Sequence, residues 1–112
     1  MAIPPNSSTE KSGVDAKIAS LIAIGEVDDA ARLAEEKGLL HKALELYKKA
    51  NDPRSMGRIY EQLGELEKAM NAYERAKIYN EAARIAEKLG LSQKASAYYA
   101  KHMKAVGDIG AH

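Results

Sequence analysis

Residues 56–76 read MGRIYEQLGELEKAMNAYERA, and this stretch decides the fold. On either side of Gly64 its apolar side chains recur every three or four residues, which is the spacing of one face of a helix. A glycine costs about 1 kcal/mol inside a helix, and it is favoured at the left-handed residue that ends one. The stretch therefore predicts two short helices joined by a tight turn at Gly64.

The same pattern returns along the chain at a step of thirteen residues. The step positions are Gly25, Gly38, Asn51, Gly64, Lys77 and Gly90. Five residues after each step comes Ala30, Ala43, Met56, Ala69, Ala82 and Ala95. Nine residues after each step comes Ala34, Tyr47, Tyr60, Tyr73, Ala86 and Tyr99. Self-similarity at a fixed period is typical of repeat proteins, in which neighbouring units stabilise one another.

The step divides the chain into short helices. We predict seven of them, over residues 14–24, 27–37, 40–50, 53–63, 66–76, 79–89 and 92–105. One long helix is rejected because several glycines recur where the apolar stripe restarts, and because Asp52 and Pro53 form a cap followed by a proline at the first helical position. Helices of about ten residues are not stable alone in water, so packing on neighbours must hold each one.

Turns of about three residues force successive helices to run antiparallel. The predicted fold is therefore all-α, a solenoid or superhelix of three helical hairpins preceded by an N-terminal helix, and it occupies residues 14–106. Residues 1–13 are Pro- and Ser-rich and are predicted to form a disordered leader, and residues 107–112 a flexible tail. Tyr47, Tyr60, Tyr73 and Tyr99 are predicted to face inward, and Tyr79 and Tyr98 to be partly exposed.

Composition excludes several classes of function. The 112 residues carry 17 basic and 16 acidic side chains, a net charge of +1, which gives no reason to expect nucleic acid or an anionic membrane as a partner. No cysteine is present, and the three histidines lack the spacing of metal ligands. We find no nucleophile beside a base and no phosphate-binding loop. We therefore expect a non-enzymatic cytoplasmic protein without a metal or cofactor.

The hairpin over residues 53–76 resembles the tetratricopeptide repeat. That family places glycine, tyrosine, glycine, alanine, an aromatic residue and alanine at the spacing seen here for Gly57, Tyr60, Gly64, Ala69, Tyr73 and Ala76. The second half of the pattern recurs from Gly38 and from Gly90, and more weakly from Gly25. The period is 26 residues, shorter than the 34 of the family. The family's closing proline is absent, with Glu81 in its place, and so is its early large apolar residue.

The resemblance implies a scaffold that binds other proteins, with the first helix of each hairpin lining a concave surface. Outward positions of those helices are predicted to contact a partner: Arg32, Arg58 and Arg84, with Arg54 and Asn80 one turn before. A row of guanidinium groups suits the carboxylates of a peptide. The alternative is a solvated face, in which Glu35, Glu61 and Glu87 neutralise the arginines three residues before them. Tyr79 and Tyr98 are further candidate contacts.

The last predicted helix carries a broad apolar surface for a final element. Its members are Ala95, Tyr98, Tyr99, Ala100, Met103 and Val106. A self-complementary patch commonly forms a two-fold dimer. Two functions therefore stay open: a scaffold or adaptor that binds a protein or peptide segment, and a homo-oligomerising assembly subunit with no groove ligand, with a homodimer through this helix as one possibility.

Overall fold

The computed structural model describes the backbone of residues 7–110 and the side chains of residues 13–107. Every regular element in this part of the chain is an α-helix. The helices are α1 (Ser7–Ala23), α2 (Val27–Glu36), α3 (Leu40–Lys49), α4 (Pro53–Gln62), α5 (Leu66–Arg75), α6 (Tyr79–Lys88) and α7 (Ser92–Gly110). They fall into two compact units, Met1–Asn51 and Asp52–His112. Within each unit every helix packs on its neighbour in sequence, so the predicted all-α repeat class is confirmed.

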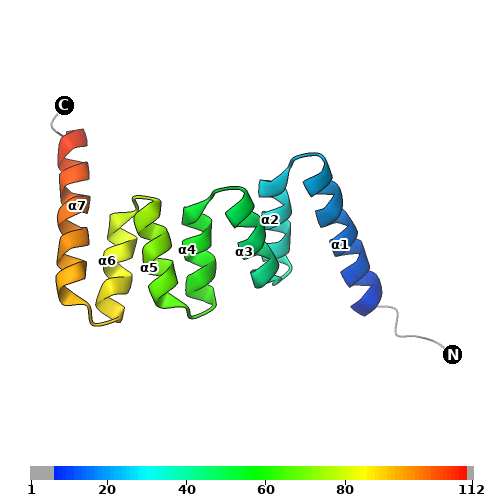
Figure 1. Cartoon of the computed structure of the whole chain (residues 1–112), viewed down its shortest axis with the longest axis horizontal. Coiled ribbons are helices and arrows are strands. Elements are labelled where there is room, and N and C mark those ends of the chain that lie inside the picture. Colours follow the sequence, from blue (N-terminus) through cyan, green and yellow to red (C-terminus); the bar gives the residue numbers. More distant parts are fainter. Residues whose placement is uncertain (1–6, 111–112) are drawn as a thin grey trace. The chain divides into compact units, whose positions relative to one another are not determined.

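The first unit contains α1, α2 and α3. Helix α2 packs against both of the others, and Figure 1 shows the chain reversing its direction at each turn. Its core is built from small side chains with a few large ones between them. The buried apolar residues are Ile18, Ala30, Ala31, Ala34, Ala43, Leu46 and Tyr47. Alanine on the central helix lets its neighbours approach closely.

The second unit contains α4, α5, α6 and α7, packed in that order (Figure 1). Its largest fully buried side chains are Ile59, Met70 and Ile85, one from each of the first three helices. Gly57 on α4 allows the closest approach in this core, because a Cβ atom there would lie 2.9 Å from ring carbons of Tyr73 on α5. Gly57, which matches the first glycine of the repeat pattern, is therefore required for packing, because the Tyr73 ring lies directly against the α4 backbone there.

The turns explain the step of thirteen. All six step positions have positive φ, between 56° at Asn51 and 85° at Gly25. At Gly64 the backbone N–H donates to the Glu61 carbonyl at 3.0 Å, and the Glu65 N–H donates to the Tyr60 carbonyl at 2.9 Å. This paired arrangement satisfies carbonyls that the helix end leaves open. Glu65 then accepts from the Ala69 N–H at 3.0 Å and so begins the next helix. Ten helical residues and three turn residues make one step.

The five middle helices begin where the sequence predicts, and each ends one residue earlier because the last predicted residue is its cap. The outer helices differ. Helix α1 begins at Ser7, seven residues before the predicted start, and α7 ends at Gly110, beyond the predicted end at 105. The step would put further turns at Ser12 and Met103, and neither residue is of a type that favours left-handed backbone. The predicted leader and tail otherwise lie outside the described residues.

The burial of two adjacent tyrosines on α7 is the reverse of the prediction. Tyr98 is 3% exposed and Tyr99 is 39% exposed. Tyr98 stands 26 residues after Ala72 and 52 after Leu46, which are both buried, so it fills the position that faces the preceding helices. Tyr99 follows the register of Tyr73, which is buried in a helix that α6 covers, whereas no described helix covers the corresponding side of α7.

Replacing Gly64 should test the turn directly. Nothing lies within 4 Å of a Cβ atom built there, so Gly64→Val adds backbone strain without a clash. We expect a loss of about 1–2 kcal/mol in the free energy of unfolding, since left-handed backbone costs an L-residue about that much. Lys77→Gly is the matched control, because it removes the same cost at φ 62° and should raise stability. Urea unfolding measures the change in the free energy of unfolding for each variant. Changes of the same sign in both variants would contradict the assigned turn.

Candidate functional site

Each hairpin carries one hydrogen bond between a tyrosine and a glutamate twelve residues before it. Tyr47 Oη donates to Glu35 at 2.8 Å, Tyr73 Oη to Glu61 at 3.2 Å, and Tyr99 Oη to Glu87 at 2.6 Å. The bond joins the last turn of the first helix to the eighth residue of the second. The three glutamates considered above as neutralising partners for the arginines therefore also accept tyrosine hydroxyls.

In the second unit Glu61 connects three helices. Arg84 on α6 holds both of its carboxylate oxygens, with Nη2–Oε1 and Nη1–Oε2 distances of 2.9 Å. Lys88 Nζ lies 3.8 Å from Oε2, and Tyr73 on α5 donates to Oε1. The hydrogen bond from Arg84 is the main reason that the pKa of Glu61 lies below its usual value. Burial, followed by the Glu61 charge, raises the pKa of Tyr73 to about 12.

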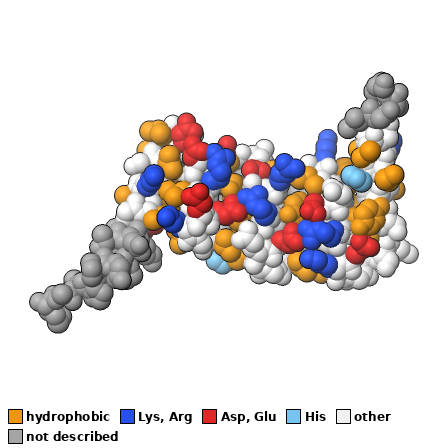
Figure 2. All heavy atoms as spheres, turned by 180° about the vertical axis from the view of Figure 1, so that it is seen from behind, with side chains coloured by type: hydrophobic (Ala, Val, Ile, Leu, Met, Phe, Trp, Pro, Cys, Tyr) orange, Lys and Arg blue, Asp and Glu red, His pale blue; other side chains and the backbone are white. Residues whose placement is uncertain are grey.

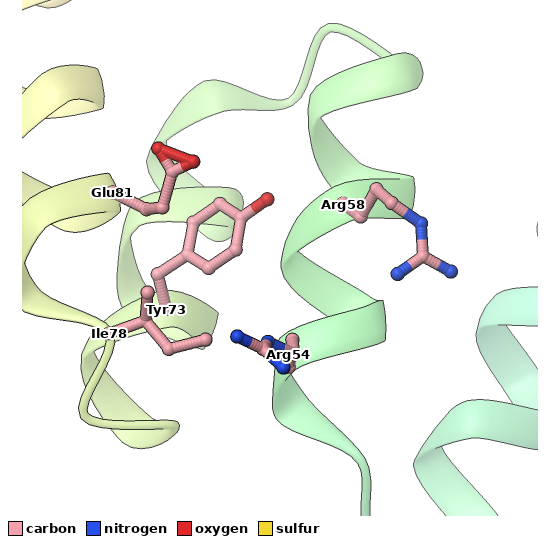
Figure 3. A pocket seen from close by; sticks show the side chains of 5 residues that line it. All are labelled: Arg54, Arg58, Tyr73, Ile78 and Glu81. Carbon is pink, nitrogen blue, oxygen red and sulfur yellow. The ribbon is translucent and has the colours of Figure 1, made fainter.

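Beside this cluster the second unit has a surface hollow of about 330 Å³. Its lining residues are Arg54 and Arg58 on α4, Tyr73 on α5, Ile78 before α6, and Glu81 on α6. Figure 3 shows the Tyr73 ring between α4 and α6, with the two arginines on one side of it and Glu81 on the other. The position of the ring is fixed by Gly57 beneath it and by the hydrogen bond to Glu61.

The hollow has an apolar floor, with two arginines on one side and Glu81, which is paired with Arg84, on the other (Figure 3). Tyr73 and Ile78 supply the floor, and Arg54 and Arg58 are exposed one helical turn apart. The start of α4, next to Arg54, is capped by Asp52, which accepts from the Ser55 N–H at 3.2 Å and from Ser55 Oγ at 2.7 Å. Arg58 Nη1 lies 3.5 Å from that same hydroxyl. Such a surface suits an apolar side chain next to a carboxylate.

The structure brings together only part of the predicted set. Arg54 and Arg58 line the hollow, and Arg84 lies near it, half-buried and paired with Glu61 and with Glu81 through Nε at 2.8 Å. Asn80 is exposed on α6 but does not line the hollow. Arg32 belongs to the first unit, where it is exposed and forms an ion pair with Asp29 that raises its pKa.

The two predicted tyrosines form a cluster between α6 and α7. The Tyr79 and Tyr98 rings stack with centroids 6.4 Å apart, and Lys101 Nζ lies 5.4 Å from the Tyr79 ring centre. Tyr98 Oη donates to Glu74 at 2.7 Å. Burial, with the Glu74 hydrogen bond as the next cause, raises the pKa of Tyr98 to about 12. The buried Tyr98 therefore packs helices together, and the prediction that it is partly exposed is wrong.

Sequence reasoning missed the part that Ile78 and Glu81 play in lining the hollow, and it missed the contacts of Glu61 with Tyr73 and with its main partner Arg84. A signal for the tyrosine contact was present, because in each of the three hairpins a Tyr stands twelve residues after Glu35, Glu61 or Glu87. Ile78 carries no such signal, since the equivalent residues Glu26 and Asp52 are acidic. Glu81 was noted only as the residue that stands in place of the family's proline.

Side chains 13–107 contain no group of His, Asp and Glu residues that could hold a metal ion. Among the described helices, none is long and apolar enough to cross a membrane. Figure 2 shows basic and acidic side chains interspersed over one face, with apolar side chains gathered at the α7 end on the right.

Residues 55–77 match the family model of the tetratricopeptide repeat. The matched residues include most of α4 and all of α5. No curated protein matches the chain, and no solved structure matches it. The matched segment, together with the short helices that pack in sequence within each unit, confirms the predicted resemblance to a tetratricopeptide-like helical repeat. Such a repeat implies a general role in protein interaction.

The contacts of Glu61 with Arg84, Lys88 and Tyr73 predict that the protein loses stability at low pH. The pKa of Glu61 is lowered in the fold, so its contribution is complete above the usual carboxyl pKa near 4.5 and is lost as pH falls below that value. Glu61→Gln should lower the free energy of unfolding by about 1–2 kcal/mol at pH 7 and by less at pH 3.

Glu87→Gln is the matched control. Glu87 occupies the same register 26 residues later and accepts the Tyr99 hydroxyl at an exposed site, without an arginine partner among the described residues. Its substitution should cost less than that of Glu61. Urea titrations at both pH values measure the difference, and a Glu61→Gln loss that does not shrink at low pH would contradict the assigned role of the carboxylate.

Proposed function

We propose that this tetratricopeptide-like chain is a non-enzymatic scaffold that binds an acidic peptide or protein segment at the hollow of its second unit. One observation carries the proposal: Arg54 and Arg58 line an apolar-floored hollow of about 330 Å³. The segment places an apolar side chain on Tyr73 and Ile78 and a carboxylate beside the guanidinium groups. A pocket with an apolar floor and a few convergent polar groups is typical of ligand sites.

The position of the hollow supports this assignment. Helices α4 and α6 are the first helices of their hairpins, which the family resemblance places on the ligand side. Arg84 serves a different purpose, because it holds Glu61 and Glu81 and so fixes α6 against α4 at the edge of the hollow. We assign ligand contact to Arg54 and Arg58 because both line the hollow, and a positioning role to Arg84. A cytoplasmic location stays a prediction.

A second role, homo-oligomeric assembly, is favoured by a separate observation. Three large apolar side chains on α7 are well exposed: Tyr99 at 39%, Met103 at 66% and Val106 at 50%. They lie close together around the helix, next to the side of α7 that carries the buried residues Ala95 and Tyr98. The two roles use different surfaces of the second unit, so the chain can perform both.

Peptide binding should depend on the α4 arginines. On an array of ten-residue peptides, those with Asp or Glu next to Leu, Ile or Phe should bind best. Arg54→Ala combined with Arg58→Ala should weaken that binding about tenfold or more, since a hydrogen bond to a charged group contributes about 1.5–3 kcal/mol. Added salt should weaken wild-type binding as well.

Arg75→Ala is the control, because Arg75 is an exposed arginine of the same unit that does not line the hollow. It should leave binding within a factor of two or so of wild type. Acidic peptides that bind the double variant and wild type equally would overturn the proposed ligand site.

A further inference from the structure

The two sides of the hollow in the second unit carry opposite charges. Arg54 and Arg58 lie on the α4 side, and Glu81 of α6 lies on the other side of the Tyr73 ring (Figure 3). The floor between them, formed by Tyr73 and Ile78, is uncharged. A segment that crosses the hollow therefore meets cations first, then an apolar surface, and then a carboxylate.

Glu81 can accept a hydrogen bond from a ligand although it is paired with Arg84. Its side chain is 35% exposed. Arg84 Nε donates to Oε1 at 2.8 Å, whereas the contact of Arg84 Nη2 with Oε2 is longer, at 3.4 Å. A carboxylate has about four acceptor positions, so the pairing with Arg84 leaves acceptor capacity on Glu81.

Arg84 also divides its charge between two carboxylates. Besides Glu81, it holds both carboxylate oxygens of Glu61 at 2.9 Å. Lys88, the other cation of this cluster, lies 3.8 Å from Glu61 Oε2, and half of its side chain is exposed. One guanidinium therefore serves two acidic groups, and the α6 side of the hollow still attracts a further cation at Glu81.

The floor between the two charged sides favours an apolar side chain. Tyr73 is only 6% exposed, and its hydroxyl donates to Glu61 at 3.2 Å, so that proton is already used. Ile78 contributes hydrocarbon alone. A polar side chain placed on this floor would lose hydrogen bonds to water without replacing them, which costs free energy.

This arrangement discriminates between three charge patterns. A segment with acidic residues on both sides of its apolar residue would place a carboxylate beside Glu81, and like charges placed together weaken binding. A segment with basic residues on both sides would meet Arg54 and Arg58 with the same result. A segment with opposite charges on the two sides matches both edges of the hollow.

We infer that the segment bound at the hollow carries an apolar side chain between an acidic and a basic one. The acidic residue lies beside Arg54 and Arg58, and the lysine or arginine lies beside Glu81. The inference rests on the binding role proposed above, and it specifies the charge pattern of the ligand for that role.

Fluorescence anisotropy with three labelled peptides tests the pattern on the unaltered chain. Each peptide keeps the acidic and apolar residues of the strongest binder from the array. Lysine, methionine or glutamate is placed one or two positions beyond the apolar residue, on the side away from the acid. The lysine peptide should bind about threefold more tightly than the methionine peptide, and the glutamate peptide about threefold more weakly, as expected for an ion pair near the surface.

The outcomes separate the charge pattern from the binding role. Three peptides of equal affinity, or an order that begins with glutamate, would overturn the charge pattern and leave binding beside α4 in place. If none of the peptides with adjacent acidic and apolar residues binds the chain, the proposed function itself is wrong.

Glu81→Gln locates the contact with the basic residue. It keeps the size of the side chain and removes the charge, so the lysine and methionine peptides should bind this variant within a factor of about 1.5 of each other. Glu67→Gln is the matched control, because Glu67 is an exposed glutamate of the same unit that does not line the hollow. It should retain the lysine preference of wild type.

Each of these results is a ratio of two affinities for one variant, so partial unfolding of that variant does not change it. A lysine preference that survives Glu81→Gln would place the basic residue elsewhere and overturn the inference.

Discussion

The structure depends on a left-handed residue at every thirteenth position. Each one ends a helix, and the next helix begins after a turn of three residues that is closed by a pair of backbone hydrogen bonds such as those at Gly64 and Glu65. The turns therefore limit the five middle helices to ten residues each, and helices this short do not persist alone. Their stability depends on packing between neighbours, which the buried alanines five residues after five of the six steps make close.

Because the turn residues are visible in the sequence, the starts of the five middle helices and most of the core were predictable. The outer helices were less so, since Ser12 and Met103 stand where the step would put turns and the helices continue past them. The burial of Tyr98 and Tyr99 was predicted the wrong way round. The prediction assumed that the residue nine positions after a step faces inward in the last helix as it does in the earlier ones. Comparison of Tyr98 with Ala72 and Leu46, which are buried, gives the correct face.

The candidate site was harder to predict because its geometry depends on contacts between residues far apart in sequence. Glu61 and Arg84 are 23 residues apart and meet only when α6 packs on α5 and α5 packs on α4. The floor of the hollow depends on Gly57 admitting the Tyr73 ring, and Ile78 reaches it from the turn before α6. Helical spacing identifies Arg54 and Arg58 as exposed, but it does not show which apolar groups lie beside them.

The three arginines of the predicted row show how the same register position acquires different roles. Arg32 and Arg84 each pair with a carboxylate three residues before, Asp29 and Glu81, whereas the corresponding partner of Arg58 is the hydroxyl of Ser55. Arg84 has a second acidic partner in Glu61, and this pairing fixes it as part of the structure. The feature that sets α4 apart is the hollow, which Arg54 and Arg58 both line together with Tyr73.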